Sequence, residues 1–388
     1  MTPIIGRVRW GRGLTLCSLL LVLSLTAACG DDDDDDSDPT ATEAESDATA
    51  TDAETEETAE VTAEATADGG AATEEASDAA PPEQTSISIG VSGGGGGVLS
   101  TVDLALEEGF YEEYGLTDVE VVPFQSSSDL ATALLTGAID VGVGAYTGLL
   151  IAAGAGEEGQ AFYVQSTCPC YSIISTTYDS LEEASAAGGS IGTSSPGGLD
   201  WTVTHVLLET AGIDPSTLEF VTGLGQTEKA DQILNGSIDL GSVTPPGSVK
   251  IRSSEDAQTL LEMRDVIPDF PFEVAWAATS FIEENPNTIQ AVVNAIGATA
   301  DWARENVDET VQFTIENEQV SPEDEEFFRE GFTEYLIPSW PSAADEISLE
   351  GAEVMAQAYV DEGQITTDNL EEFVISTFNF NFTGDKQP

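Results

Sequence analysis

Hydroxyl-bearing and glycine residues follow the first predicted strand of this chain and form a segment suited to binding a ligand. The segment begins with Ser92, Gly93 and Gly94, directly after the alternating stretch 86–91, and a helical stretch starts at Val98. A glycine-rich loop between a strand and a helix lets a ligand approach the backbone N–H groups at the helix start. Neither Gly-Lys-Ser/Thr nor G-x-G-x-x-G spacing occurs here, so a P-loop and a dinucleotide fingerprint are excluded. The alternative interpretation is a flexible entry to the fold.

Three further segments place hydroxyl groups and rings directly after predicted strands. Residues 124–129 form a hydroxyl-rich turn, and Ser128 or Asp129 is expected to cap the helix predicted over 130–136. Capping accounts for only one of these side chains, so the others remain available for a ligand. The contact candidates from the three segments are Ser127, Ser128, Asp129, Tyr146, Thr147, Thr244 and Pro245.

A stretch that occurs twice indicates how these segments are arranged. Residues 134–143 read LLTGAIDVGV, and residues 233–242 read ILNGSIDLGS. In each copy a helix is expected to end at the glycine before a short apolar strand begins. Two similar α/β units that each end in a ligand loop predict two lobes facing a cleft. Asp140 and Asp239 stand at the other end of these strands, and we interpret them as structural caps.

The charge of the chain excludes several partners. The sequence holds 72 Asp+Glu, 10 Lys+Arg and one histidine, for a formal charge of −62. Such a surface repels nucleic acid and anionic lipid, so neither is expected as a partner. No Lys or Arg lies between residues 13 and 228, so the predicted first lobe begins without a cationic catalytic group. His205 lies in a helical pattern without the partners of a catalytic triad.

The first 29 residues have the pattern of a bacterial export signal. Basic residues near the start precede an apolar run over 14–28, which is short for a membrane span. The run ends in Leu-Thr-Ala-Ala-Cys, which resembles a lipobox, so Cys29 is expected to be lipidated. Thr26 stands where that motif usually has Leu, and a free or disulfide-bonded Cys29 is the alternative. The protein is therefore expected outside the cytoplasm, lipid-anchored to the outer face of the cytoplasmic membrane or periplasmic.

Residues 30–85 are predicted to be a disordered acidic linker between this anchor and the folded body. They begin with a run of Asp at 31–36 and contain few apolar side chains. Segments of this kind cannot bury enough apolar surface to offset the entropy cost of ordering. The folded body then covers residues 86–388, a length at which a single core usually divides in two.

Two apolar segments are predicted to cross between the lobes. Residues 161–177 read as strands that lead from lobe one to lobe two, and residues 273–279 as the strand that returns. Cys168 and Cys170 lie on the first crossing, and an oxidising compartment permits a disulfide between them, although the ring would be small and strained. Two buried free thiols are the alternative. A metal site is disfavoured, because His205 is the only histidine.

The order of these segments resembles a known family. The run EEGFYEEYGL, a strand, a serine turn and ALLTGAIDVGVG are together similar to the substrate-binding proteins of ABC importers. Within that class the chain most resembles the SsuA/THI5-like (NMT1) branch, which includes sulfonate-, taurine-, nitrate- and thiamine-precursor-binding proteins. The run FIEENPNTIQAVVNAIGATADWARENVDE is similar to the return helices of that family, and the resemblance extends from residue 86 to about residue 320. Helices are expected over 286–305, 308–317, 322–334 and 346–361.

The resemblance implies an α/β, periplasmic-binding-protein-like type II fold. Two α/β lobes would be joined by a two-strand hinge after the disordered acidic tether. Lobe one would comprise residues 86–167 and 277–388, and lobe two would comprise residues 168–276.

The resemblance also extends the set of expected ligand contacts. Carried over from a second-lobe loop of the family, Ser194, Ser195 and Gly197 are expected to contact the ligand. Trp201 either stacks on the ligand or packs within its lobe. Trp276 lies near the hinge, where it either contacts the ligand or fills the core.

Solute binding without turnover is the function that the resemblance implies. Lobe closure about the hinge would bury a small-molecule solute, and the closed form would dock on an ABC permease with its ATPase. The eukaryotic pyrimidine synthases of the superfamily need a lysine for pyridoxal phosphate, which the first lobe does not offer, so no enzyme activity, cofactor or metal is expected. The protein is expected to be a monomer, held at the membrane by its lipid anchor. A ligand-sensing lipoprotein that signals to a membrane receptor and a THI5-like enzyme are the alternatives.

The residue types favour a nitrogen-containing ring over an anion as the ligand. Tyr146, Trp201, Asp129 and Asp200 suit a neutral or cationic ring such as a pyrimidine thiamine precursor. A sulfonate, taurine or nitrate would depend on N–H groups at helix starts. The strong negative charge of the chain opposes such an anion.

The acidity of the chain leads to a prediction about salt. A folded body this acidic must withstand self-repulsion, which salt screens. If the acidity is an adaptation to high salt, the Tm rises between low and molar NaCl in a melting curve. The alternative is an acidic exported protein without such adaptation, and a Tm that does not rise would support it.

Overall fold

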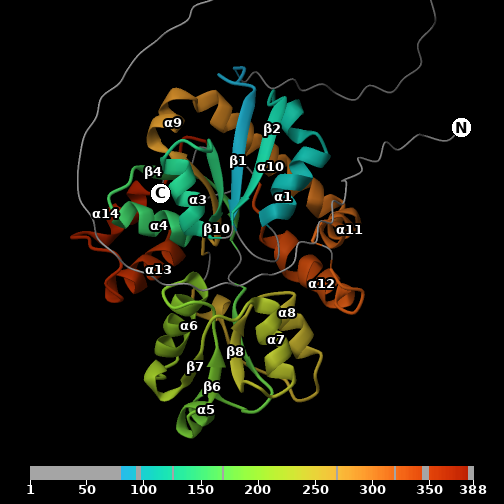
Figure 1. Cartoon of the computed structure of the whole chain (residues 1–388), viewed down its shortest axis with the longest axis vertical. Coiled ribbons are helices and arrows are strands. Elements are labelled where there is room, and N and C mark those ends of the chain that lie inside the picture. Colours follow the sequence, from blue (N-terminus) through green and yellow to red (C-terminus); the bar gives the residue numbers. More distant parts are fainter. Residues whose placement is uncertain are drawn as a thin grey trace, which may run out of the picture. The chain divides into compact units, whose positions relative to one another are not determined.

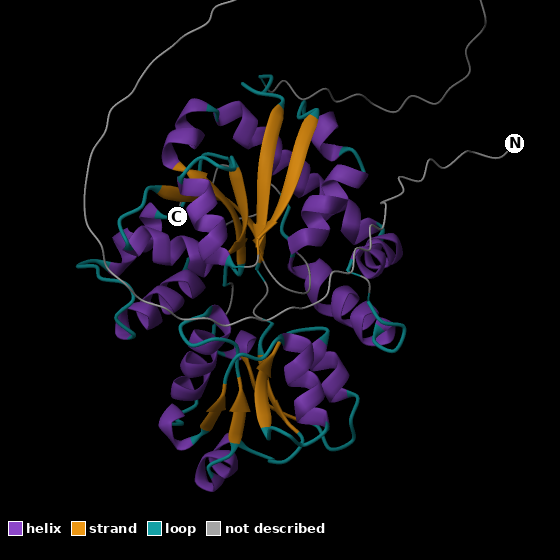
Figure 2. Cartoon of the chain, viewed as in Figure 1, coloured by secondary structure: helices purple, strands orange, loops and turns teal. Residues whose placement is uncertain are grey.

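The computed structural model describes residues 80–92, 98–124, 126–167, 170–267, 270–318, 320–342 and 349–382. All of them belong to one compact unit, Glu75–Pro388. In this unit the strands form two five-stranded sheets with helices packed against them (Figure 1, Figure 2). We call the two halves lobe one and lobe two. The predicted signal peptide, Cys29 and residues 30–79 of the predicted linker lie outside the described residues.

Lobe one is built around a mixed sheet. Its strands are β1 (Ser86–Ser92), β2 (Asp118–Phe124), β3 (Val141–Ala145), β4 (Gly159–Ser166) and β10 (Glu273–Ala278). They lie in the order β2-β1-β3-β10-β4. The first three are parallel to one another, whereas β10 runs antiparallel between β3 and β4. The predicted return strand is thus confirmed, and it enters the interior of the sheet.

Lobe two repeats the arrangement of lobe one. Its strands are β5 (Ser172–Ser175), β6 (Ser190–Gly192), β7 (Glu219–Val221), β8 (Leu240–Val243) and β9 (Gln258–Glu262). They lie in the order β7-β6-β8-β5-β9, with β5 antiparallel between β8 and β9. β3 and β8 therefore occupy equivalent positions, as the repeated sequence predicts.

The chain crosses between the lobes twice, after β4 and after β9. The first crossing confirms the strands predicted over 161–177, which are β4 and β5. The predicted boundary at residue 276 falls inside β10 and needs correction. Because Glu273 pairs with Ala145 of β3, lobe one resumes by Glu273. Cys170 on the first crossing is disulfide-bonded, and its predicted partner Cys168 lies outside the described residues.

Helices and 3-10 turns join the strands of both lobes. In lobe one they are α1 (Val98–Glu107), α2 (Phe110–Glu113), α3 (Ser127–Leu135) and α4 (Tyr146–Gly154). In lobe two they are α5 (Leu181–Ala187), α6 (Leu199–Thr210), η1 (Pro215–Thr217), α7 (Gln226–Leu234), α8 (Gly247–Arg252) and η2 (Met263–Asp265). The sequence places Tyr146 and Thr147 in a loop, whereas the structure makes them the first residues of α4, because β3 passes into this helix without a turn.

The C-terminal helices follow β10. They are α9 (Thr279–Glu284), α10 (Pro286–Glu305), α11 (Val307–Asn317), α12 (Glu325–Gly331), the π-helical turn η3 (Phe332–Leu336), the 3-10 turn η4 (Ile337–Ser339), α13 (Glu350–Asp361) and α14 (Leu370–Ser376). The helix predicted over 286–305 is confirmed as α10. The helix predicted over 322–334 is divided into α12 and η3, and α14 was not predicted.

The end of the predicted linker is fixed to lobe one. The Glu83 carboxylate accepts hydrogen bonds from the backbone N–H groups of Asn287 and Thr288, at 3.1 and 2.8 Å, in the first turn of α10. Burial raises the pKa of Glu83, but these bonds outweigh it and hold the pKa below its usual value. Linker residues 80–85 are therefore part of the folded body.

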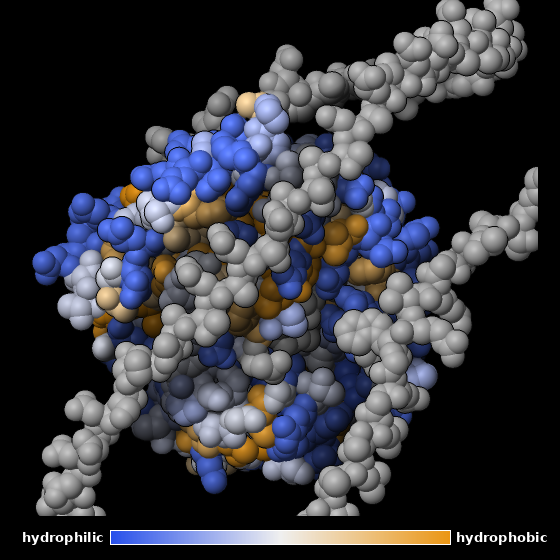
Figure 3. All heavy atoms as spheres, turned by 45° about the horizontal axis from the view of Figure 1, so that its top comes forward, coloured by the Kyte–Doolittle hydropathy of each residue, from blue (hydrophilic) through white to orange (hydrophobic). Residues whose placement is uncertain are grey.

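The surface of the described part is mostly hydrophilic on the face shown in Figure 3, and apolar residues gather toward its middle. Among the described helices, none combines the length and apolar character that crossing a bilayer requires.

Two equivalent aspartates, at the start of β3 and of β8, each tie that strand to its parallel neighbour in the same lobe, β1 and β6 respectively. Asp140 accepts hydrogen bonds from the Ser88 N–H and Oγ, both at 2.8 Å. Asp239 accepts the same pair from Ser190, again at 2.8 Å. In return, each serine Oγ accepts from the aspartate N–H at 3.0 Å. Both aspartates thus have the structural role that the sequence predicts.

This clamp can be tested in lobe one. Asp140→Ala leaves the Ser88 N–H and hydroxyl without their acceptor, so we expect the free energy of unfolding to fall by about 1–3 kcal/mol in urea titration. Asp118→Ala is the control, because Asp118 is an exposed residue that accepts from Ser86 Oγ. Equal losses in the two variants would contradict a specific role for the clamp.

Candidate functional site

The predicted contact residues that the structure describes lie mainly at the carboxyl ends of the parallel strands. Ser92 ends β1, Thr147 follows β3, and Thr244 follows β8. In open α/β sheets, ligands bind beyond this end of the strands. The predicted contact residues therefore lie mainly at the edge of each sheet where a ligand is expected to bind. Gly93 and Gly94 lie outside the described residues.

The serine turn of lobe one is organised differently from the prediction. Ser126 caps α3, with its Oγ accepting from the Asp129 N–H at 3.1 Å, so neither Ser128 nor Asp129 is the cap. Ser128 and Asp129 are exposed, and the Asp129 carboxylate accepts from Ser126 Oγ at 2.8 Å. Ser127 faces β1 instead, with its hydroxyl 3.3 Å from that of buried Ser92.

Two rings that the sequence analysis placed among the ligand contacts lie in the core of lobe one. Tyr146 is fully buried, its hydroxyl lies 2.8 Å from Thr377 Oγ1, and its ring packs on Phe378. Trp276 is 1% exposed, and a Cβ at Gly159 would come within 2.9 Å of its ring. For Trp276 this agrees with the core alternative. The buried position of Tyr146 does not support the predicted contact between its ring and a ligand.

A buried ion pair organises the equivalent edge of lobe two. Lys229 is fully buried, and its Nζ donates to Asp200 Oδ2 at 2.9 Å and to the Ser242 carbonyl at 2.5 Å. The same carboxylate oxygen accepts from the Ser194 N–H at 2.5 Å. Burial lowers the pKa of Lys229, while Asp200 opposes that shift. The pair joins α7, the start of α6, the Ser194 loop and the end of β8, so Asp200 is already neutralised by the protein.

The remaining candidates of lobe two divide between its surface and its interior. Trp201 packs on His205 and Phe220, with ring centroids 4.4 and 4.8 Å away, in agreement with the packing alternative. Ser195 is exposed, and Gly197 adopts a left-handed φ of 77°. Thr244 donates its N–H to Gln226 Oε1 at 3.2 Å, and Pro245 is buried beside it.

Lobe one places one unsatisfied hydroxyl next to lobe two. Tyr359 of α13 is fully buried, and its hydroxyl has no hydrogen bond of standard geometry to any described residue. Burial raises its pKa, while the nearby hydroxyls of Thr202 in lobe two and Thr147 in lobe one lower it. A further contact between the lobes, from Thr202 Oγ1 to Glu362 at 3.4 Å, lies close by. Periodicity alone gave no sign of Tyr359, because α13 follows a segment where the family resemblance ends.

Tyr359, Thr147 and Thr202 form a cluster of hydroxyl groups, and Tyr171 and Glu273 of the crossings extend it. Tyr171 follows the disulfide-bonded Cys170, and its pKa is raised by burial first and then by neighbouring Asp200, Tyr359 and Glu273. Glu273 opens β10, where burial raises its pKa to about 8. Its carboxyl forms no hydrogen bond or ion pair with any described residue. The sequence signal that could have drawn attention to Glu273 is the presence of a charged residue at the start of the apolar run 273–279.

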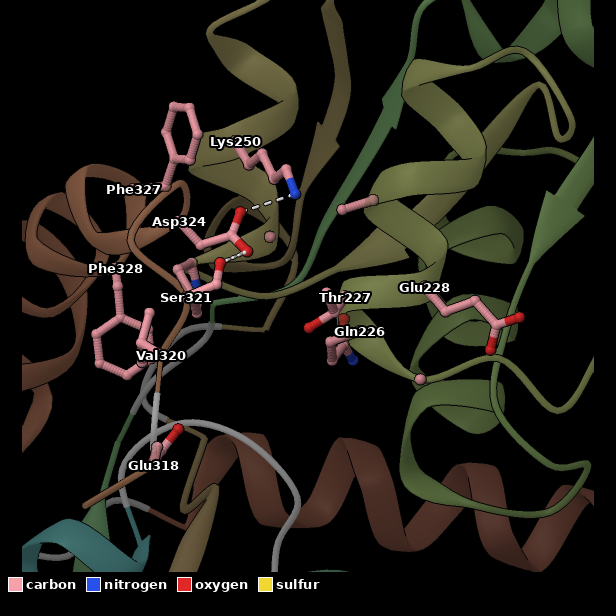
Figure 4. A pocket seen from close by; sticks show the side chains of 14 residues that line it. Gln226, Thr227, Glu228, Lys250, Glu318, Val320, Ser321, Asp324, Phe327 and Phe328 are labelled. Carbon is pink, nitrogen blue, oxygen red and sulfur yellow. Dashed lines mark hydrogen bonds and ion pairs between the residues drawn. The ribbon is translucent and has the colours of Figure 1, made fainter. Parts of the chain in front are cut away.

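A cavity of about 570 Å³ lies between α7 and α8 of lobe two and the segment around α12 (Figure 4). Glu318, Val320 and Phe328 line one side, and Gln226 and Thr227 from the first turn of α7 line the other (Figure 4). Burial raises the pKa of Glu318 to about 7.

Basic residues hold the two lobes together along this side. Lys250 Nζ of α8 lies 2.8 Å from Asp324 Oδ1 and 2.9 Å from Asp231 Oδ1. Arg252 and Arg264 of lobe two both lie over the ring of Tyr335 in η3, with 5.8 and 5.5 Å to its centroid. These contacts therefore join lobe two to the C-terminal helices.

Comparison with known proteins identifies the family. The family model described as NMT1/THI5 like matches residues 100–310, more than half of the chain. The chain belongs to the NMT1/THI5-like family. A search of curated protein sequences gives no match.

Solved structures show the same fold at low sequence identity. A protein from Bordetella bronchiseptica RB50 has a TM-score of 0.61 at 22% identity, with 78% of this chain and 97% of that chain covered. The periplasmic aliphatic sulphonate-binding protein SsuA from Escherichia coli has a TM-score of 0.57 at 15% identity, covering 73% and 94%. The periplasmic nitrate-binding protein NrtA from Synechocystis PCC 6803 has a TM-score of 0.56 at 15% identity, covering 77% and 87%. The expected periplasmic-binding-protein fold is thereby confirmed.

The buried ion pair of this NMT1/THI5-like chain can be tested by removing its cation. Lys229→Met leaves the Asp200 carboxylate buried and unpaired, so we expect a loss of about 3–5 kcal/mol in the free energy of unfolding, measured with urea. Lys250→Met is the control, because the partly exposed Lys250 contributes at most about 1 kcal/mol. A Lys229 variant as stable as the Lys250 variant would contradict the organising role of the pair.

Proposed function

We propose that this chain is the extracytoplasmic substrate-binding component of an ABC importer, which captures a small organic solute by lobe closure and delivers it to a permease. Membership of the NMT1/THI5-like family supports a solute-binding role. The E. coli and Synechocystis structures are described as periplasmic binding proteins for sulphonate and nitrate, which supports a location outside the cytoplasm. Lipidation of Cys29 would hold a monomer at the membrane beside the permease and its ATPase.

The unsatisfied hydroxyl of Tyr359 is the observation that carries this proposal. A buried hydroxyl without a hydrogen-bond partner costs stability, and such groups call for a specific explanation. Thr147 and Thr202 place two further hydroxyls beside it, one from each lobe. A polar solute bound between the lobes would satisfy the Tyr359 hydroxyl and contact both lobes at once, which couples binding to closure.

Binding without turnover fits the chemistry of this region. Lys229 is committed to Asp200 and Ser242, so it is not free to form a Schiff base or act as a base. His205 packs between Trp201 and Phe220, with its Nδ1 2.8 Å from the Trp201 carbonyl. The described residues contain no group of three His, Cys, Asp or Glu side chains suited to hold a metal ion. The family resemblance implies a pyrimidine thiamine precursor or a sulfonate, taurine or nitrate anion as the solute, and of these the residue types favour the pyrimidine.

The proposal is tested first by identifying the solute. Mass spectrometry of the gently purified full chain is expected to release one small organic compound. Adding that compound back is expected to contract the protein in small-angle scattering without converting the compound. Chemical conversion would instead support a THI5-like enzyme, and the absence of any bound or rebinding solute would contradict the proposal.

The role of Tyr359 is tested by removing only its hydroxyl oxygen. Tyr359→Phe deletes an unpartnered group, so stability is expected to stay constant or rise, whereas affinity for the identified solute is expected to fall about tenfold, the effect of one lost hydrogen bond. Tyr111→Phe is a matched control, since Tyr111 is also buried with an unpartnered hydroxyl but lies on α2. Unchanged affinity in Tyr359→Phe, measured by calorimetry, would remove this residue from the site.

A further inference from the structure

Helix α12 and the turns that follow it are fixed to lobe one by an apolar cluster. Phe328 and Phe332 stack with their ring centroids 4.6 Å apart, and Trp340 packs edge-on against Phe332. These rings belong to a buried cluster with residues of α10 and α11, among them Ala303. A close-packed apolar core of this kind holds its elements together as one body. The segment from α12 to η4 therefore belongs to lobe one.

The other side of this segment meets lobe two through polar groups. Lys250 Nζ of α8 lies 2.8 Å from Oδ1 of Asp324, the residue before α12 (Figure 4). Arg252 and Arg264 lie over the ring of Tyr335 in η3, at distances typical of a cation–π interaction. We call Lys250, Arg252 and Arg264 the basic face of lobe two. Contacts between partly exposed charges are individually weak, so this side of the segment separates more easily than the apolar side.

The scarce positive charge of the chain is concentrated at this contact. Six Lys and Arg side chains lie in the described residues, and three of them form the basic face. The opposite segment carries acidic residues at positions 323–326, 330 and 334. Because both lobes hold more acidic than basic residues, they repel each other, and complementary charge at one contact determines where they are held together.

The contact between α12 and lobe two is not packed like a core. The cavity of about 570 Å³ lies along it, and both Lys250 and Asp324 line this cavity (Figure 4). The backbones approach closely at Gly331 of α12, where a Cβ would come within 3.1 Å of Pro246 Cα. Pro246 directly follows Pro245, a predicted solute contact. Surfaces that leave such a space between them lose fewer contacts on separating than close-packed surfaces do.

A second contact joins the lobes on the other side of the crossings (Figure 1). There α13 of lobe one meets α6 of lobe two, and Thr202 Oγ1 lies 3.4 Å from Glu362 Oε2. The side chain of Gln364 lies next to Gly197 at the same contact. Opening of the lobes about the crossings must loosen this second contact as well. Movement of α12 away from α8 by itself would leave it intact.

We propose that the basic face of lobe two is an electrostatic latch, which binds the segment around α12 and η3 while the lobes are closed and releases it when they open. This inference goes beyond the proposed function, because the latch acts on the lobes whichever solute they hold. Opening exchanges the ion pair and the cation–π contacts for contacts with water. Since such contacts are weak, the latch shifts the balance toward the closed form without preventing release of a solute.

Hydrogen–deuterium exchange of the dialysed full chain tests the latch without any added solute. Asp324→Asn and Tyr335→Leu remove the acidic and the aromatic partner of the basic face. In the double variant, amides of α6 and α13, as well as those of α8 and α12, are expected to exchange about threefold faster than in the wild type. Faster exchange confined to α8 and α12 would show local packing only and would overturn the inference. Unchanged exchange in all four helices would overturn it as well.

Asp231→Asn is the matched control for Asp324→Asn. Asp231 Oδ1 lies 2.9 Å from the same Lys250 Nζ, but Asp231 belongs to α7 in the same lobe. Its substitution removes an ion pair of this lysine without touching the contact between the lobes. Exchange in α6 and α13 is therefore expected to match the wild type. An Asp231 variant that loosens these helices as much as Asp324→Asn would contradict a latch between the lobes.

Salt distinguishes an electrostatic latch from a packing contact. Interaction with Lys250 lowers the pKa of Asp324, and interaction with Asp324 raises the pKa of Lys250, so both groups are charged at neutral pH. In about 1 M NaCl the screening length falls to about 3 Å, so the ratio of exchange rates between Asp324→Asn and wild type is expected to approach one. Screening of the general repulsion affects both proteins alike and cancels in this ratio. A ratio that is the same at low and molar salt would overturn the electrostatic latch.

The solute identified by mass spectrometry provides a further measurement. Its dissociation rate in stopped-flow experiments is expected to rise about two- to fivefold in Asp324→Asn, with little change in the association rate, because the latch stabilises the closed complex without contacting the solute. An unchanged dissociation rate would contradict the latch and leave the proposed function intact, since the solute still binds. A chain that binds no solute would refute the function, whereas the exchange experiment would still decide on the latch.

Discussion

The pairing of β10 with both β3 and β4 is the interaction on which the rest of the structure depends. It inserts a strand from the second half of the chain into the interior of the first sheet, so lobe one cannot be completed until lobe two has been traversed. β5 has the equivalent antiparallel position in lobe two. These two insertions fix where the chain crosses between the lobes. They thereby bring Tyr171 and Glu273, distant in sequence, to the same junction.

Scarcity of positive charge shapes how the lobes are stabilised and what they can bind. Lys229 is buried within lobe two, where it holds Asp200, the Ser194 loop and the end of β8 in one hydrogen-bonded group. Lys250 and Arg252 act along the contact with the C-terminal helices. Each Lys and Arg side chain of the described residues therefore has an acidic partner.

Much of the fold could be predicted, but less of the site. The repeated motif predicted two equivalent units, and the Asp140 and Asp239 clamps confirm the structural role assigned to them. The ligand contacts were assigned by residue type at strand ends, a rule that locates an edge but not the direction of a side chain. Tyr146 illustrates the limit: β3 passes directly into α4, and the ring turns into the core toward Phe378 instead of toward a ligand.

The sequence by itself determined the two α/β units, the two crossings, the acidity and the family, because hydrophobic periodicity, glycine stops and segment order are local properties of the chain. Only the tertiary structure decided which polar groups remain unsatisfied between the lobes. That property depends on contacts between residues far apart in sequence. Tyr359 lies near Thr147 and Thr202, and Asp200 pairs through Oδ2 with Lys229 while its Oδ1 has no hydrogen-bond partner among the described residues. A polar group can bind a ligand only if another group of the folded chain has not already paired with it. Because the two partners are often far apart in sequence, local sequence patterns do not reveal such pairs.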